Sequence, residues 1–214
     1  MLRRIRTEPS AVVLIAQLAA VLVYPFLDNA AGRAVFSVLG ILVLGLVLIA
    51  VRSSPAHTWI AVVLGMPATC LLLAQVVTGE EDLFVYSAAF EAPLYFYAAY
   101  ALLRYMLADH DISRDELWAV GATFTLVAWG FAYLYTVCQA LDPGSFTAAV
   151  EPEAQRTWME LLYLSFTTLT STGLSDIVPV RPFARSVVMI EQLAGLGDVA
   201  MVVSRLVGLT LRRT

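Results

Sequence analysis

The residues best suited to chemistry form one short polar run in the carboxyl-terminal third of the sequence. Seven hydroxyl-bearing or small residues are interrupted by two leucines and followed by an aspartate: Thr167, Thr168, Thr170, Ser171, Thr172, Gly173 and Ser175, with Leu169 and Leu174 between them and Asp176 at the end. At membrane depth such a run cannot face lipid, so it must be buried in protein or line water. Non-helical backbone at the end of a half-helix is a recurring construction of ion pathways.

The composition indicates that this run belongs to a membrane protein. Of the 214 residues, 60% are hydrophobic and only 14% are charged, which is too little polar material for the surface of a soluble domain. All 13 basic residues are arginines, and they are scattered rather than gathered in a stripe, so we expect no nucleic-acid partner. The cysteines and histidines lack the neighbours that a metal site or a nucleophilic triad requires. We therefore expect no enzyme activity and no cofactor.

Six apolar stretches are long enough to cross the roughly 30 Å hydrocarbon core as helices. They cover residues 11–27, 34–51, 59–77, 84–107, 117–141 and 182–209. A barrel would need alternating apolar and polar residues, which these stretches lack. We predict an all-α membrane protein with six transmembrane helices. An even number of spans puts both termini on the same side of the membrane. Arginines are more frequent on that side, so we predict that both termini are cytoplasmic. We expect the protein in the plasma (inner) membrane.

The interval between the fifth and sixth spans contains a helix too short to cross. Thr157 and Glu160 fit a capping box, so a helix is predicted to begin at Thr157. About thirteen helical residues extend roughly 20 Å, enough to enter the bilayer halfway. We predict a re-entrant helix that carries the polar run to membrane depth.

The stretch from Leu162 to Pro179 resembles the pore helix and selectivity filter of the tetrameric potassium-channel superfamily. The residues that follow, from Pro182 through Gly195 to Leu209, resemble the inner helix of small prokaryotic members. The resemblance covers roughly residues 111–210. It implies a fourfold pore, so we expect a homotetramer in the lipid bilayer. Its pore domain would be 111–214, with outer helix, pore helix, filter loop and inner helix, after a four-helix transmembrane region at 1–110.

The filter departs from the superfamily pattern. Where the superfamily reads Thr-Val-Gly-Tyr-Gly-Asp, this chain has Ser171, Thr172, Gly173, Leu174, Ser175 and Asp176. In the left-handed backbone of the second superfamily glycine, Ser175 would cost roughly 1 to 2 kcal/mol. Leu174 also lacks the aromatic hydroxyl that braces the superfamily filter. The resemblance implies that Thr170, Ser171 and Thr172 offer carbonyl and hydroxyl oxygens to a monovalent cation, K⁺ or Na⁺. We expect weak discrimination between these two ions.

The sixth span carries three ionisable residues at seven-residue steps, Glu191, Asp198 and Arg205. Asp198 either contributes to a ring of acids that concentrates cations in a central cavity, or is neutral or paired at a subunit contact. Glu191 and Arg205 match residues common in the related channels, and we favour structural roles for them. Gly195 matches the gating hinge of the superfamily, and close helix packing through a small residue is the alternative.

The first four spans show no voltage-sensor pattern, because the fourth carries only Arg104 instead of repeated arginines. Glu91 in that span is either a proton or ligand site or, as we favour, the hydrogen-bond partner of a tyrosine. We expect no soluble regulatory domain after the last span. Gating would then come from lipid, pH, membrane tension or an unknown regulatory subunit.

Two functions from different classes fit these residues. The leading hypothesis is a potassium-channel-like passive cation channel with weak or altered selectivity. The alternative is a non-conducting membrane protein that keeps the channel scaffold and acts as a sensor or interaction subunit. Ion flux through the purified protein distinguishes them.

Overall fold

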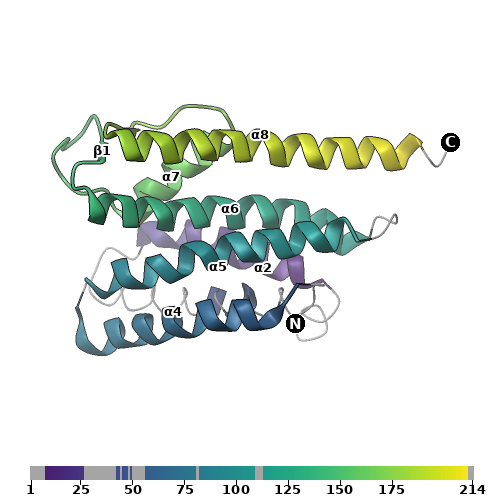
Figure 1. Ribbon diagram of the computed structural model, residues 1–214, viewed down its shortest axis with the longest axis horizontal. Coiled ribbons are helices and arrows are strands. Elements are labelled where there is room, and N and C mark those ends of the chain that lie inside the picture. Colours follow the sequence, from purple (N-terminus) through teal and green to yellow (C-terminus); the bar gives the residue numbers. More distant parts are fainter. Residues whose placement is uncertain are drawn as a thin grey trace. The chain divides into compact units, whose positions relative to one another are not determined.

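The computed structural model describes residues 8–26, 42–43, 45–47, 49, 56–80, 82–108 and 113–211, with side chains described as far as Ser204. The described chain is mostly helical and divides into two compact units, Met1–Gly130 and Phe131–Thr214. The boundary falls inside helix α6 (Arg114–Leu141), so this helix contributes its first part to one unit and its last part to the other. Figure 1 labels the α-helices of the described chain and strand β1.

The described part of the first unit consists of α2 (Pro9–Val23) with the 3-10 turn η1 (Tyr24–Phe26), α4 (Thr58–Thr78), α5 (Leu83–Met106) and the start of α6. Helices α4 and α5 pack side by side (Figure 1). Gly79 ends α4 with a left-handed φ of 74°, a conformation that glycine adopts without steric cost.

Helix α2 runs parallel to the start of α6. The carboxylate of Asp115 accepts hydrogen bonds from the backbone N–H and the hydroxyl of Ser10, at 3.1 and 2.9 Å. Further along both helices, the hydroxyl of Thr125 donates to Oε1 of Gln17 at 2.9 Å. The first N–H groups of a helix have no partner within it, so Asp115 acts as a cap supplied by another helix.

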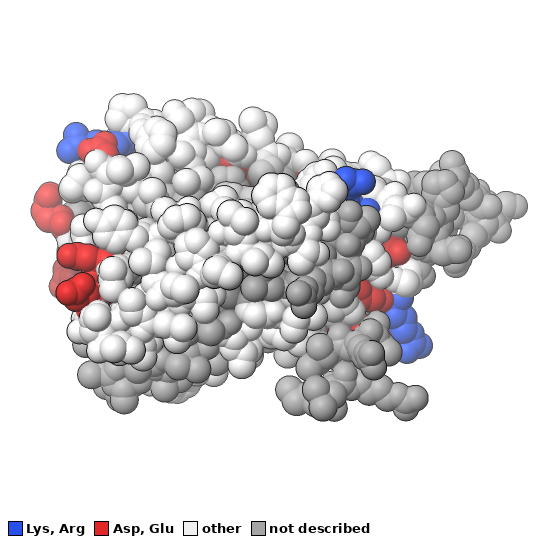
Figure 2. All heavy atoms as spheres, turned by 60° about the horizontal axis from the view of Figure 1, so that its bottom comes forward, with Lys and Arg blue, Asp and Glu red and all other residues white. Residues whose placement is uncertain are grey.

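Four described helices are long and apolar enough to cross a membrane: Pro9–Phe26, Thr58–Thr78, Arg114–Leu141 and Pro182–Ser204. Figure 2 shows a face on which uncharged residues predominate. The predicted second span, 34–51, lies mostly outside the described residues. The predicted fourth span is the 24-residue helix α5, which is not among the four. The mostly helical architecture is as predicted, and six spans remain a prediction.

The second unit begins with the last part of α6 and continues through β1 (Phe146–Thr147), α7 (Trp158–Leu169), β2 (Val178–Pro179) and α8 (Pro182–Leu211). The two short strands pair antiparallel, with Phe146 opposite Pro179. Helix α7 packs against α8 (Figure 1). The polar run lies between α7 and β2, so the strand pair ties its far end to the loop that follows α6.

Candidate ion pathway

The backbone turns sharply directly after α7. The carbonyl of Thr167 accepts hydrogen bonds from the N–H groups of Thr172 and Gly173, at 3.1 and 3.2 Å. Ser171 and Gly173 adopt left-handed backbone angles, with φ of 58° and 63°. Because a Cβ disfavours this region, Ser171 carries a local cost of roughly 1 to 2 kcal/mol. The hydrogen bonds to Thr167 hold the turn in place despite that cost.

Ser175 stands where the superfamily has its second glycine, yet its φ is not positive. Among the described non-glycine residues only Glu151 and Ser171 have a positive φ. The hydroxyl of Ser175 instead accepts the N–H of Ile177 at 3.1 Å. The backbone at Ser175 therefore has a conformation that a residue with a Cβ adopts without strain. The serine in the left-handed region is Ser171, four positions earlier.

Two threonine hydroxyls of the predicted cation site lie next to each other. The Oγ1 atoms of Thr170 and Thr172 are 3.0 Å apart, and Thr170 also donates to the carbonyl of Phe166 at 2.7 Å. Residues 170–174 are all exposed in the single chain, as is Asp176. The rest of the subunit therefore does not cover these residues of the run.

Tyr163 of α7 holds the outer part of the run. Its hydroxyl donates to the carbonyl of Leu174 at 3.2 Å, while the Leu174 side chain is exposed. The hydroxyl brace that a superfamily filter takes from its own tyrosine thus comes from the preceding helix. The Leu174 carbonyl is therefore engaged by a hydrogen bond within the subunit.

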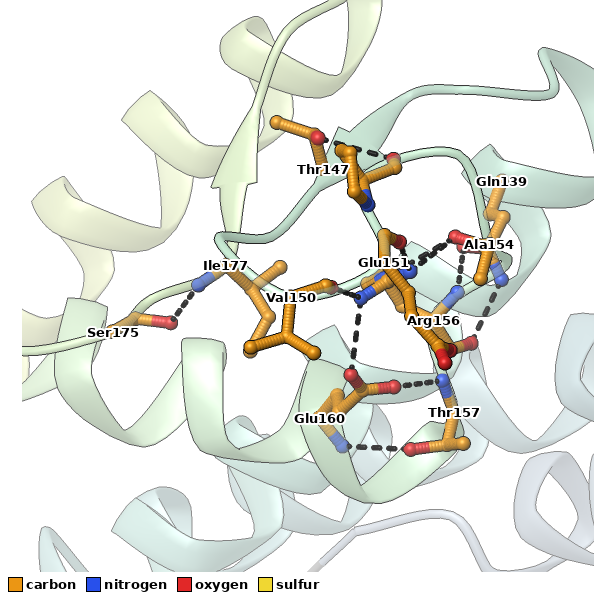
Figure 3. Close-up of polar contacts among 11 residues, drawn as sticks. Gln139, Thr147, Val150, Glu151, Ala154, Arg156, Thr157, Glu160, Ser175 and Ile177 are labelled. Carbon is orange, nitrogen blue, oxygen red and sulfur yellow. Dashed lines mark hydrogen bonds and ion pairs between the residues drawn. The ribbon is translucent and has the colours of Figure 1, made fainter.

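A buried arginine fixes the loop that leads into α7. The Arg156 guanidinium donates to the carbonyls of Val150, Glu151 and Ala154 at distances from 2.5 to 3.4 Å (Figure 3). The side chain of Gln139 in α6 bonds both the N–H and the carbonyl of Arg156, at 2.7 and 2.9 Å. The loop is therefore wrapped around one side chain and tied to α6.

Thr157 and Glu160 form the predicted capping box. The Thr157 hydroxyl accepts the N–H of Glu160 at 3.3 Å, and the Glu160 carboxylate accepts the N–H of Thr157 at 2.6 Å (Figure 3). Helix α7 begins at Trp158, within one residue of the prediction. The same carboxylate pairs with Arg156 at 3.2 Å, so the helix cap and the loop share one acid.

Helix α8 contacts α7 through Glu191 and Gly195. A Cβ at Gly195 would lie 2.9 Å from the Cα of Leu169 and closer still to its carbonyl oxygen, so only glycine fits. Glu191 is fully buried, and its carboxylate accepts hydrogen bonds from the hydroxyls of Ser165 in α7 and Tyr135 in α6. Close packing at Gly195 therefore has direct geometric support, and the hinge remains a prediction.

Asp198 lies on α8 seven residues after Glu191 and is partly exposed. Its Oδ1 atom is buried and has no hydrogen-bond partner among the described residues. A Cβ at Gly197, one residue earlier, would meet nothing within 4 Å, so α8 has an open face beside Asp198 in the single chain. The side chain of Arg205 lies outside the described part of the chain. An open face is compatible with both interpretations of Asp198, a cavity lining and a subunit contact.

Known proteins match the part of the chain that holds this site. The family model described as "Ion channel" matches residues 121–211. Protein LctB of Geobacillus stearothermophilus is 34% identical over 103 residues, which cover 47% of this chain and 76% of that protein. The chain belongs to the ion channel family. Protein LctB of Bacillus caldotenax is 32% identical over 104 residues with the same coverage. No solved structure gives a significant match.

Membership of the ion channel family confirms the resemblance to the potassium-channel pore superfamily. The matched residues begin in α6 and contain α7, the polar run and α8. The features described above therefore lie in the part of the chain that the family shares.

Sequence reasoning found the polar run of this ion channel but missed the side chains that hold it. The missed residues are Tyr135, Gln139, Arg156, Tyr163 and Ser165. Four of them are buried, and three of these, Tyr135, Gln139 and Ser165, lie in apolar segments, where a polar side chain must find a partner. That signal was present in the sequence, whereas the identity of each partner was not.

Proposed function

We propose that four copies of this chain form a passive channel for monovalent cations, with its narrowest part at residues 170–176. One observation carries the proposal: the Thr167 carbonyl holds a turn after α7 whose hydroxyl-rich residues, 170–172, are exposed in the single subunit. Polar backbone at membrane depth must be covered by protein or water. Copies of the chain around a shared axis cover it and leave a conduit between them.

The charges near the run favour cations. Residues 157–180 contain no basic side chain. The polar run follows the carboxyl end of α7, which carries the negative end of the helix dipole. Thr170, Ser171 and Thr172 supply hydroxyl and carbonyl oxygens, the ligands that a dehydrated monovalent cation requires. If Asp198 lines the cavity in its charged form, it adds one acid per subunit on the inner helix and raises the local cation concentration.

We also propose that the channel discriminates weakly between potassium and sodium. Strong selectivity depends on the number and arrangement of carbonyl oxygens that replace the hydration shell. In this chain the Leu174 carbonyl is engaged by Tyr163, and Ser175 does not adopt the left-handed backbone of a filter glycine. Both observations support a site restricted to the inner half of the run.

The proposed topology has six spans in the inner membrane, with both termini cytoplasmic. Residues 1–110 form a four-helix region without voltage-sensor charges, and residues 111–214 form the pore domain. Arg104 lies in the last turn of α5, where it would mark the cytoplasmic end of the fourth span.

The test is the reversal potential of purified protein in planar bilayers with potassium on one side and sodium on the other. Weak selectivity predicts a potential within about 59 mV of zero, since 59 mV corresponds to a tenfold ratio for one charge. A larger shift toward the potassium potential contradicts weak selectivity. Absence of any protein-dependent cation flux supports the non-conducting scaffold instead, and a purified particle without fourfold symmetry contradicts the assembly.

A further inference from the structure

Glu191 lies where three helices of the second unit meet. Its side chain is 0% exposed, although a carboxylate in a membrane-spanning helix is costly to bury. Each of its two oxygens accepts a hydrogen bond from a different helix: Oε1 from the hydroxyl of Ser165 in α7, and Oε2 from the hydroxyl of Tyr135 in α6. One carboxylate therefore links the outer helix, the pore helix and the inner helix.

The contact to α7 lies close to the start of the polar run. Ser165 lies two residues before Thr167. The carbonyl of Thr167 accepts hydrogen bonds from the N–H groups of Thr172 and Gly173. Four residues further along both helices, Gly195 of α8 contacts Leu169 at the end of α7. The two contacts lie one helical turn apart on each helix, so together they fix both the height and the rotation of α7 against α8.

We propose that Glu191 is a positioning residue for permeation, which sets the place of the ion-binding oxygens by holding α7 through Ser165. This inference rests on the proposed channel function. We assign Glu191 no direct contact with the ion, because its carboxylate is fully buried and both of its oxygens are engaged by Ser165 and Tyr135. A shift of α7 along or around its axis moves the Thr167 carbonyl, and the turn at residues 171–173 moves with it. The geometry of the inner filter, and hence the choice between ions, follows from the carboxylate.

The two hydroxyl partners make separable contributions. Ser165→Ala removes the bond to the pore helix and leaves the bond to Tyr135, whereas Tyr135→Phe does the reverse. Glu191→Leu removes both bonds. Glu191→Gln keeps the shape of the side chain. Its amide oxygen can accept a hydrogen bond from one of the two hydroxyls, while its NH₂ group donates to the oxygen of the other.

The experiment reconstitutes the full-length protein in vesicles and measures potassium and sodium flux for each variant. The ratio of the two fluxes is the readout, because a loss of folded protein lowers both fluxes and leaves the ratio unchanged. Ser165→Ala is expected to change the ratio by at most about fivefold, the factor that corresponds to the whole net energy of one hydrogen bond, about 1 kcal/mol. Glu191→Leu is expected to change it at least as much, and Glu191→Gln less. Tyr135→Phe is expected to change it least, because α6 does not carry the filter.

Ser186→Ala is the matched control, because among the described residues its hydroxyl bonds only the Pro182 carbonyl of its own helix, at 3.1 Å. The inference is wrong if Ser165→Ala and Glu191→Gln both show the same flux ratio as the control. In that case cation flux through the wild-type protein still supports the proposed channel function. If Glu191→Leu fails to assemble, Ser165→Ala alone decides the outcome. If the wild-type protein passes no cation, the proposed channel function is wrong, and this inference is wrong with it.

Discussion

Two glycines on α8, two residues apart, should respond in opposite ways to the same added methyl group. A Cβ at Gly195 would lie 2.9 Å from the Cα of Leu169 and 3.0 Å from its carbonyl carbon, whereas a Cβ at Gly197 would meet nothing within 4 Å. The obstructing atoms at Gly195 belong to backbone, which cannot rotate away as a side chain does. Gly195→Ala therefore forces α7 and α8 apart, and Gly197→Ala does not.

Two opposing effects determine how much each substitution should change the free energy of unfolding. Overpacking of a well-packed contact costs about 1–3 kcal/mol, and contact with backbone puts Gly195→Ala toward the upper end. Replacing glycine by alanine inside a helix gains about 1 kcal/mol. Gly195→Ala should then lose about 1–2 kcal/mol net, while Gly197→Ala gains about 1 kcal/mol. The two variants should differ by about 2–3 kcal/mol per subunit.

Thermal unfolding of the detergent-purified protein measures this difference. For a chain of this size, about 2–3 kcal/mol corresponds to a separation of roughly 4–12 °C between the two melting temperatures. Gly195→Ala should melt below the wild type and Gly197→Ala at or above it. If Gly195→Ala melts as high as Gly197→Ala, the packing interpretation is wrong. A change confined to channel opening, without loss of stability, would then support the hinge.

Three further predictions concern the side chains that hold the helices. Arg156→Lys keeps the positive charge but loses the fork of N–H donors, so it should lower the free energy of unfolding in chemical denaturation by about 2 kcal/mol. The control is Arg181→Lys, because Arg181 forms a half-exposed ion pair with Asp142 at 3.8 Å. This control should change the free energy of unfolding by less than about 1 kcal/mol. Asp115→Ala removes the cap of α2 and should cost about 1–2 kcal/mol in the same assay. Tyr163→Phe frees the Leu174 carbonyl and should change the potassium-to-sodium flux ratio by at most about fivefold, the factor for the whole net energy of one hydrogen bond. The same change at exposed Tyr86 should leave the ratio at the wild-type value.

Local features of the site could be predicted because adjacent residues determine them. The spacing of Thr157 and Glu160 placed the start of α7 to within one residue, and both bonds of the capping box are present. Capping is decided within one helical turn, so four residues contain the whole signal. The polar run was identifiable for a similar reason, since its composition alone excludes contact with lipid.

Contacts between distant parts of the chain could not be predicted in the same way. Ser10 and Asp115 are 105 residues apart, and Tyr135 and Glu191 are 56 residues apart. Hydrophobic periodicity indicates which face of a helix is buried, but not which residue of another helix it meets. Glu191 could be given a structural role from sequence, whereas its two hydroxyl partners had to come from the structure.

The two serines of the run show where the fold accepts backbone cost. Ser171 holds a left-handed φ of 58°, although glycine at that position would remove a cost of roughly 1 to 2 kcal/mol. Ser175 avoids that region altogether. A strained serine beside Thr170 and Thr172 completes three consecutive hydroxyls on the turn held by Thr167, whereas a glycine would leave a gap between them. In the proposed channel this cost falls on the hydroxyls assigned as cation ligands, which agrees with a cation site in the inner half of the run and with the outer half as its entrance.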